Sequence, residues 1–132
     1  MGMSITAAKP DLQSHSDSVR LAPDEIISAL RETLGAKLTA YLGGVKETRA
    51  VREWMVAGGR SPADEVMVRL RASYQIMAML REHEAAATAA SWFQGMNPEL
   101  NDVAPARVLV EQELSVSVPA VLAAARSFVA LG

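Results

Sequence analysis

The stretch LTAYLGGVKETRAVREW, residues 38–54, decides the fold that we expect for this chain. Its first part has the apolar spacing of a short helix, which Gly43-Gly44 end. A second short helix begins near residues 47–48 and ends at Gly58-Gly59. The inner positions that we expect for this second helix are Val51, Trp54 and Met55. Two short helices joined by a glycine turn are the parts of a helix-turn-helix.

With those apolar side chains packed inward, the outer face of the second helix is polar and mostly basic. It carries Lys46, Thr48, Arg49, Arg52 and Glu53. Arginine side chains bind guanine edges or phosphates, so this pattern favours DNA binding. Many three-helix clusters have basic exposed faces without that role, and the pattern alone leaves both interpretations open.

Helices are also predicted on either side of this stretch. Pro23 opens one that ends at Gly35, with its apolar face formed by Ile26, Ile27, Leu30 and Leu34. Ser61-Pro62-Ala63-Asp64 resembles a helix cap, which predicts a long helix running to about Glu82. Its inward stripe is expected at Val66, Leu70, Tyr74, Met77 and Leu80.

The C-terminal third predicts three further helices. One covers residues 85–94, Pro105 opens the next and Pro119 opens the last. No segment alternates strictly between hairpin turns, so the predicted fold class is all-α. We expect a flexible N-terminal arm at 1–20, a helix-turn-helix region with its long connecting helix at 21–83, and a small helical domain at 84–132.

The composition indicates the cellular setting that we expect for this chain. The chain has 132 residues, half of them hydrophobic, a net charge of −2 and no cysteine, which suits a reducing cytoplasm. No apolar run approaches the roughly 20 residues of a membrane span, so no membrane contact is expected. The net charge of residues 36–71 is +3 and that of residues 82–132 is −4. This difference is either ordinary scatter of surface charge or a basic middle that attracts phosphate beside an acidic end.

Catalysis is not expected. The letters of a triad occur at residues 14–18, in a stretch that looks flexible, whereas triad members need a rigid scaffold. His83-Glu84 begins a zinc-binding helix pattern, but Ala87 stands where the second histidine belongs. We therefore predict a binding protein that is not an enzyme, with no metal, cofactor or small-molecule substrate.

Two parts of the chain together resemble a known family. Residues 38–54 resemble the Xre/Cro helix-turn-helix, with a turn one residue longer than the commonest form. Trp92-Phe93, Asn97-Pro98-Glu99-Leu100, Ala104-Pro105 and Val108-Leu109 resemble the toxin-binding domain of Xre/MbcA/ParS antitoxins. The family usually has glycine where this chain has Asn101 and Asp102, two residue types that tolerate left-handed backbone angles.

This resemblance implies the antitoxin of a type II toxin–antitoxin pair. Its partners are then a RES-domain toxin, whose NAD-consuming active site the C-terminal domain covers, and operator DNA, in a homodimer or a larger toxin–antitoxin hetero-oligomer. The expected toxin contacts are Leu100, Arg107, Leu109, Glu111, Glu113 and Phe128. The residues expected to maintain the two motifs are Trp54, Trp92, Asn97, Pro98 and Pro105.

Two alternatives stay open on the sequence alone. One is a free-standing helix-turn-helix regulator whose C-terminal part only dimerises. The other is a helical adaptor that binds neither DNA nor a toxin. The C-terminal motif is also compatible with a purely structural role, in which Trp92, Phe93, Pro98 and Leu100 simply build the core.

Overall fold

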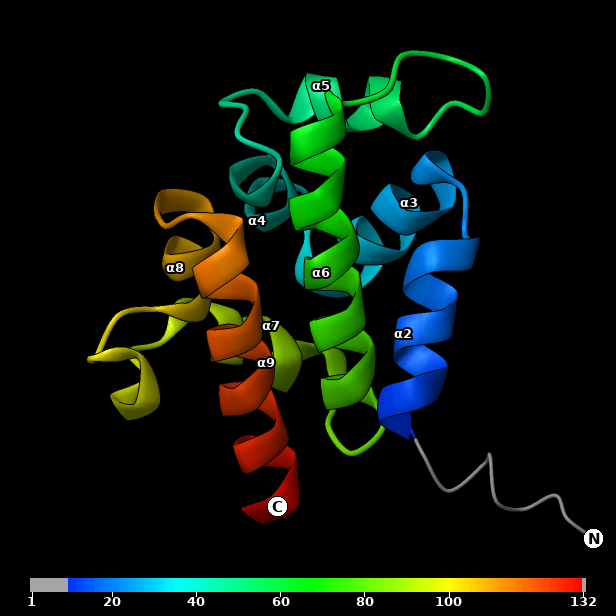
Figure 1. The fold of residues 1–132 in the computed structure, drawn as a ribbon. Coiled ribbons are helices and arrows are strands. Elements are labelled where there is room, and N and C mark those ends of the chain that lie inside the picture. The colour runs from blue at the N-terminus through cyan, green and yellow to red at the C-terminus, as the bar shows by residue number, and fades with distance from the viewer. Residues whose placement is uncertain (1–9, 132) are drawn as a thin grey trace, which may run out of the picture.

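The computed structural model describes residues 10–131, and it confirms the all-α fold class (Figure 1). These residues form α-helices and one short 3-10 helix, with no strand among them. In chain order the elements are α2 (Pro10–Arg20), α3 (Pro23–Leu34), α4 (Ala36–Leu42), α5 (Thr48–Trp54), α6 (Asp64–Arg81), α7 (Ala86–Gln94), η1 (Pro98–Leu100), α8 (Pro105–Glu111) and α9 (Leu114–Leu131).

Helix α6 occupies the centre of the molecule. Leu70, Met77 and Leu80 of its predicted stripe are buried, while Val66 and Tyr74 are only half-buried. Burial continues around the helix onto positions outside that stripe: Met67, Ala72, Ser73, Gln75, Ile76 and Met79. A helix buried on most of its circumference must be covered on several sides. Helices α2, α3 and α9 pack against it, as Figure 1 shows.

The start of α6 differs from the sequence prediction. The helix begins at Asp64 with Ala63 as its N-cap, and no side chain caps it. Ser61 therefore does not cap the helix, because Ala63 is itself extended and separates the serine from the first turn. Asp64 and Glu65 lie in that first turn, where negative charge offsets the positive end of the helix dipole.

Residues 10–20 are not the flexible arm that we expected, because they form α2 and pack along α6. Residues 1–9 lie outside the described part of the chain. Ser14 and Ser18 are buried in this contact, and small polar side chains of this kind give no hydrophobic period to recognise. Arg71 of α6 holds the end of α2, since its Nη1 donates to the carbonyl oxygens of Ser18 at 2.8 Å and Leu21 at 2.7 Å.

The last helix also begins earlier than predicted. Helix α9 begins at Leu114 and contains Pro119, which we had expected to open it. Proline has no N–H to donate to Ser115 one turn earlier, but Ser115 is exposed and water can satisfy its carbonyl. Helix α9 has 18 residues and a mean hydropathy of 1.8, so it is long and apolar enough to cross a membrane by those two criteria alone. We had not expected any segment to meet these criteria. Only 22% of these residues are buried in the structure.

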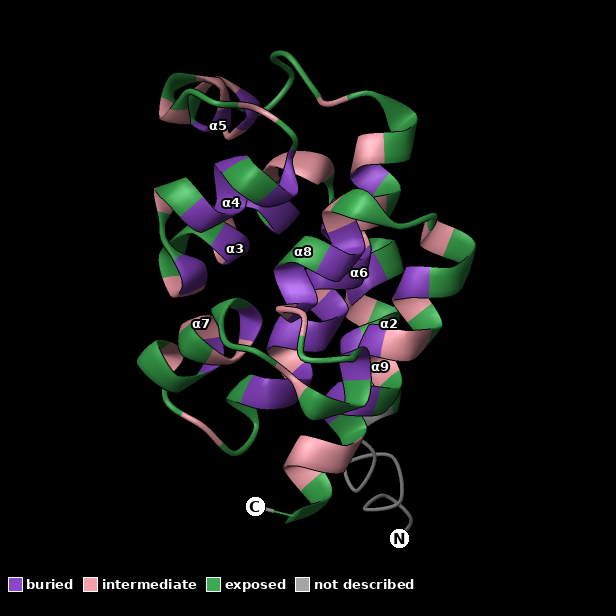
Figure 2. Ribbon diagram, turned by 90° about the vertical axis from the view of Figure 1, so that its left-hand side faces the viewer, coloured by how far each residue is buried: buried purple, intermediate pink, exposed green. Residues whose placement is uncertain are grey.

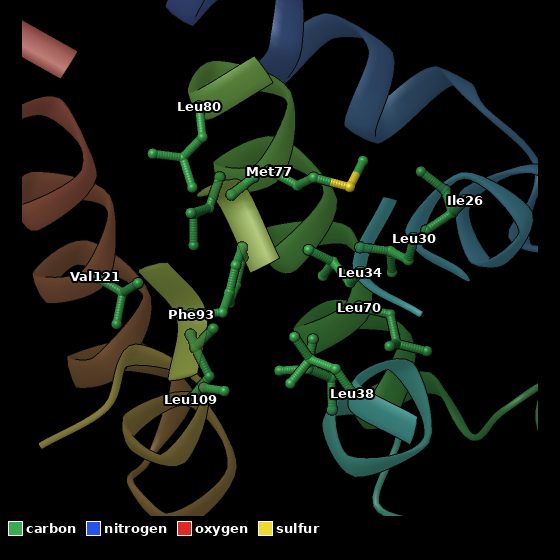
Figure 3. Packing of buried hydrophobic residues seen from close by; sticks show 14 of the residues in the cluster. Ile26, Leu30, Leu34, Leu38, Leu70, Met77, Leu80, Phe93, Leu109 and Val121 are labelled. Carbon is green, nitrogen blue, oxygen red and sulfur yellow. The ribbon is translucent and has the colours of Figure 1, made fainter. Parts of the chain in front are cut away.

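One hydrophobic core serves both predicted regions. Figure 3 shows Leu38 and Leu70, from the region 21–83, near Phe93 and Leu109 from the region 84–132. Phe93 and Leu109 have no exposed surface. Helix α7 packs on α3, α8 on α4 and α9 on α6, so elements of the two regions alternate around the core.

A shared core predicts that the two regions unfold together. In a Trp92→Phe background, Trp54 is the remaining tryptophan and reports on α5. Adding Phe93→Leu in α7 should lower the stability by about 1–2 kcal/mol through the cavity that it leaves. We expect the urea midpoint of Trp54 fluorescence to fall, together with that of far-UV circular dichroism. A Trp54 midpoint that did not move would show that the regions unfold independently.

Candidate nucleic-acid interface

Helices α4 and α5 are the two short helices expected on either side of Gly43-Gly44, with α3 packed against both of them. The turn between them covers residues 43–47. Val51 is fully buried and Trp54 is 7% exposed, as predicted, while Met55 is half-buried. In Figure 2 the buried residues of these helices lie on their inner sides and the exposed residues on their outer sides.

Gly43 makes the close approach of the two helices possible. A Cβ atom at this position would lie 2.7 Å from Cζ3 and 3.0 Å from Cη2 of Trp54. The backbone of Gly43 is right-handed helical, so its lack of a side chain serves packing rather than conformation. Gly44 provides the conformational freedom instead, because its φ of 74° lies in the left-handed region.

Arg69 of α6 holds the turn between α4 and α5 in place. Its Nε donates to the carbonyl oxygen of Leu42, at the end of α4, over 2.5 Å. Burial lowers the pKa of the Arg69 guanidinium, and the nearby Glu65 carboxylate opposes that change. In the sequence, Arg69 is recognisable only as one of the basic residues between positions 36 and 71. No local pattern distinguishes it, because its partner lies 27 residues earlier in the chain.

The turn before α5 and the outer face of α5 present the predicted DNA-binding side chains. Lys46, Arg49 and Arg52 are exposed, and Thr48 is half-buried at the start of the helix. A cleft of about 560 Å³ is lined by residues 47–50, by Arg52 and Glu53, and by Arg60, whose place here was not predicted from the sequence. The arrangement offers several hydrogen-bond donors to an anionic surface.

Glu53 is the acidic counterpart within this cleft. Its carboxylate lies 3.8 Å from Nε of Arg49 and 3.4 Å from Nη1 of Arg60. Both arginine side chains are 79% exposed, so these ion pairs contribute little to stability and can give way to another anion. Arg52 forms no ion pair with any residue in the described range, which leaves its guanidinium available.

The structure separates the six predicted toxin contacts into surface and core residues. Leu100 and Leu109 are buried and so cannot contact a partner in this conformation, which corrects that part of the prediction. Arg107 and Glu111 are exposed and paired with each other at 3.0 Å. Glu113 is exposed and accepts from the Ser115 hydroxyl at 3.3 Å. Phe128 is half-buried, with its ring centroid 6.3 Å from that of Trp92.

The residues of the C-terminal motif build a compact loop between α7 and α8. Asn97 caps η1 by accepting from the backbone N–H of Glu99 at 3.0 Å, and its backbone pairs with Val103. Asn101 and Asp102 have φ values of 58° and 63°, so the expected left-handed turn is present. Pro98 opens η1 and Pro105 opens α8, while the rings of Trp92 and Phe93 meet in a T-shaped arrangement with centroids 5.6 Å apart.

The last helix carries apolar side chains that are exposed or only partly buried. Val116 is 59% exposed and Leu131 is 88% exposed. Between them, Val118, Leu122 and Val129 are only partly buried. Nearby Met96, after the end of α7, is 80% exposed and lines a cleft with Trp92 and Phe128. We call these residues the α9 surface; Val116 and Leu131 lie near opposite ends of α9, and the partly buried residues lie beside its buried face.

Comparison with known proteins adds no relative: no family model, no curated protein and no solved structure matches this chain. Among the described residues, no three histidine, aspartate or glutamate side chains form a group suited to a metal ion.

The contact between Gly43 and Trp54 predicts a steric effect at a position where alanine is conformationally allowed. Gly43→Ala should lower the free energy of unfolding by about 1–3 kcal/mol, because the buried indole must move. Gly95→Ala is the matched control, since its Cβ would lie 3.4 Å from its nearest neighbour, an ordinary contact. Urea denaturation measures both. Equal stability of the two variants would contradict the close packing of α4 and α5.

Proposed function

We propose that this chain is the antitoxin of a type II toxin–antitoxin pair rather than an enzyme. In this proposal α5 binds operator DNA, and the C-terminal helices cover a RES-domain toxin. The observation that carries the DNA-binding half is the group formed by Lys46 in the turn before α5 and by Thr48, Arg49 and Arg52 on α5 itself. The choice of toxin rests on the family resemblance of the segment 92–109.

The fold supports DNA binding by holding α5 in place. A helix of seven residues is too short to be stable alone in water. Here Val51 and Trp54 anchor it to the core, while Arg69 holds the turn before it. The exposed side chains therefore project from a fixed backbone, which a base-reading helix needs when it enters the major groove.

The α9 surface supports the partner-binding half. Helix α9 is apolar, with a mean hydropathy of 1.8, yet only 22% of its residues are buried, and exposed apolar side chains of this kind favour a protein–protein interface. Glu111 and Glu113 lie at the corner between α8 and α9, next to Val116. Apolar side chains bordered by carboxylates complement a partner with an apolar patch and a basic rim, such as the border of a nucleotide-binding cleft.

The same surface also favours a second candidate, the free-standing regulator. In that case the α9 surface of one copy packs on that of a second copy. Symmetric dimers of this kind are the commonest oligomers and match the symmetry of many operators. The two candidates differ in whether the product of the adjacent reading frame binds to this surface.

The DNA-binding half predicts a selective effect of the α5 arginines. Arg49→Ala with Arg52→Ala should weaken binding to the DNA upstream of the operon by about 1–3 kcal/mol per base-contacting arginine. Both side chains are exposed, so the stability should change by less than about 1 kcal/mol. Fluorescence anisotropy with a labelled duplex measures the affinity, and thermal unfolding provides the stability control. A double variant that binds this DNA as the unaltered chain does would exclude α5 as the reading helix.

The partner-binding half predicts that charge on the α9 surface abolishes neutralisation. Val116→Asp with Leu131→Asp should weaken capture of the adjacent frame's product at least tenfold, about 1.4 kcal/mol. Leu12→Asp on α2 is the matched control, since Leu12 is 62% exposed. Co-purification and growth upon co-expression measure the outcome.

Neutralisation that survives the α9 substitutions, or an adjacent product that is harmless alone, would contradict the antitoxin proposal. Self-association lost with the α9 substitutions, without any partner, would favour the free-standing regulator instead. Deletion of residues 105–132 is a poorer experiment, because it also removes Leu109 and Val121 from the core.

A further inference from the structure

A cleft at the junction of the two predicted regions has no role in the function described so far. It lies between α4, α7 and α8, has a volume of about 320 Å³, and brings Lys37 together with Arg107. Figures 1 and 2 both show α4 beside α8, and the two helices are in contact. Nothing in the local sequence around either cation indicates this proximity.

The rim of this cleft consists of hydrogen-bond donors. Lys37 and Arg107 contribute positive charge, while Tyr41 and Gln94 contribute a hydroxyl and an amide. Leu38, Phe93, Ala104 and Ala106 form the apolar wall beneath them. Within residues 10–131, no acidic side chain lines the cleft. Two cations and two neutral donors around one small opening favour an anion at the rim.

Glu111 is the nearest competitor for this anion. Its Oε1 lies 3.0 Å from Nε of Arg107, one helical turn away on α8. The side chain of Arg107 is 61% exposed and that of Glu111 is 55% exposed. Ion pairs as exposed as this one contribute little to stability, so Arg107 can exchange the carboxylate for another anion at small cost. Lys37 forms no ion pair with the described residues.

The cleft is continuous with the outer face of α5. Lys37 and Tyr41 also line a neighbouring hollow that contains Lys46 and Thr48. Thr48 in turn lines the cleft of α5 with Arg49 and Arg52. A band of donors therefore runs from α5 across α4 to α8. Its cations are Lys37, Lys46, Arg49, Arg52, Arg60 and Arg107, and its anions are Glu47, Glu53 and Glu111.

We propose that Lys37, Tyr41 and Arg107 bind a phosphate of the DNA strand that borders the groove entered by α5. This inference rests on the proposed DNA-binding function and extends its contact surface into the C-terminal region. In helix-turn-helix proteins the helix before the reading helix crosses the DNA backbone, which places α4 and its neighbour α8 beside phosphates. Arg107 then belongs to the DNA-binding face, although the sequence analysis assigned it to the toxin-binding one.

The salt dependence of DNA affinity tests this inference directly. Each phosphate neutralised by a cation adds about 0.9 to the slope of log affinity against log salt concentration. Lys37→Gln with Arg107→Gln removes the contacts to that one phosphate and should therefore reduce the slope by about 0.9. The loss should be equal on operator DNA and on a mixed-sequence duplex, because phosphate contacts carry no sequence information. Lys37→Arg with Arg107→Lys keeps both charges and should restore most of the slope.

Arg81→Gln is the matched control. Arg81 is an exposed cation in the last turn of α6, whereas α5 lies near the first turn of that helix (Figure 1). This variant should keep the full slope. Circular dichroism and thermal unfolding of each variant verify that the fold is retained.

The possible outcomes separate this inference from the proposal on which it depends. If the unaltered chain binds no DNA, the proposed function itself is wrong. If Arg49→Ala with Arg52→Ala weakens binding while Lys37→Gln with Arg107→Gln leaves the slope unchanged, only the inference is overturned. It is also overturned if Arg107→Gln alone abolishes capture of the protein partner while the salt slope is unaltered.

Discussion

Burial of α6 is the constraint on which the remaining structure depends. Its apolar side chains extend around most of the helix, so helices from both ends of the chain must cover it. Two arginines on α6 then position what surrounds them: Arg69 binds the end of α4, and Arg71 binds the end of α2. The central helix thus supplies both the hydrophobic contact and the polar connections that orient its neighbours.

This arrangement explains how a short helix can present a defined face. Helix α5 has seven residues and gains its order from packing, through Val51, Trp54 and the close approach at Gly43. Its exposed side chains are therefore not needed to hold the helix in place. The basic side chains of α5 and the apolar side chains of α9 belong to separate surfaces of one core, which suits a protein proposed to bind two different partners.

The shared core also changes how the chain is divided. The ranges 21–83 and 84–132 carry different motifs, yet Phe93 and Leu109 pack with Leu38 and Leu70. Residues assigned to one region by sequence can therefore act on a surface formed mainly by the other. Arg107 is the case in point, because it shares a cleft with Lys37 of α4.

The sequence by itself determined the all-α class, the helix pair around Gly43-Gly44, the inward side of α5 and the left-handed turn at residues 101–102. Each of these depends on local periodicity or on the backbone preference of single residues. It did not determine helix α2, whose buried face is serine rather than apolar, or the continuation of α9 through Pro119. Tertiary structure alone decided that Leu100 and Leu109 are core residues, that Arg69 fixes the turn and that Lys37 meets Arg107. The physical reason is that burial and partner choice depend on contacts between segments far apart in the chain, which no local pattern encodes.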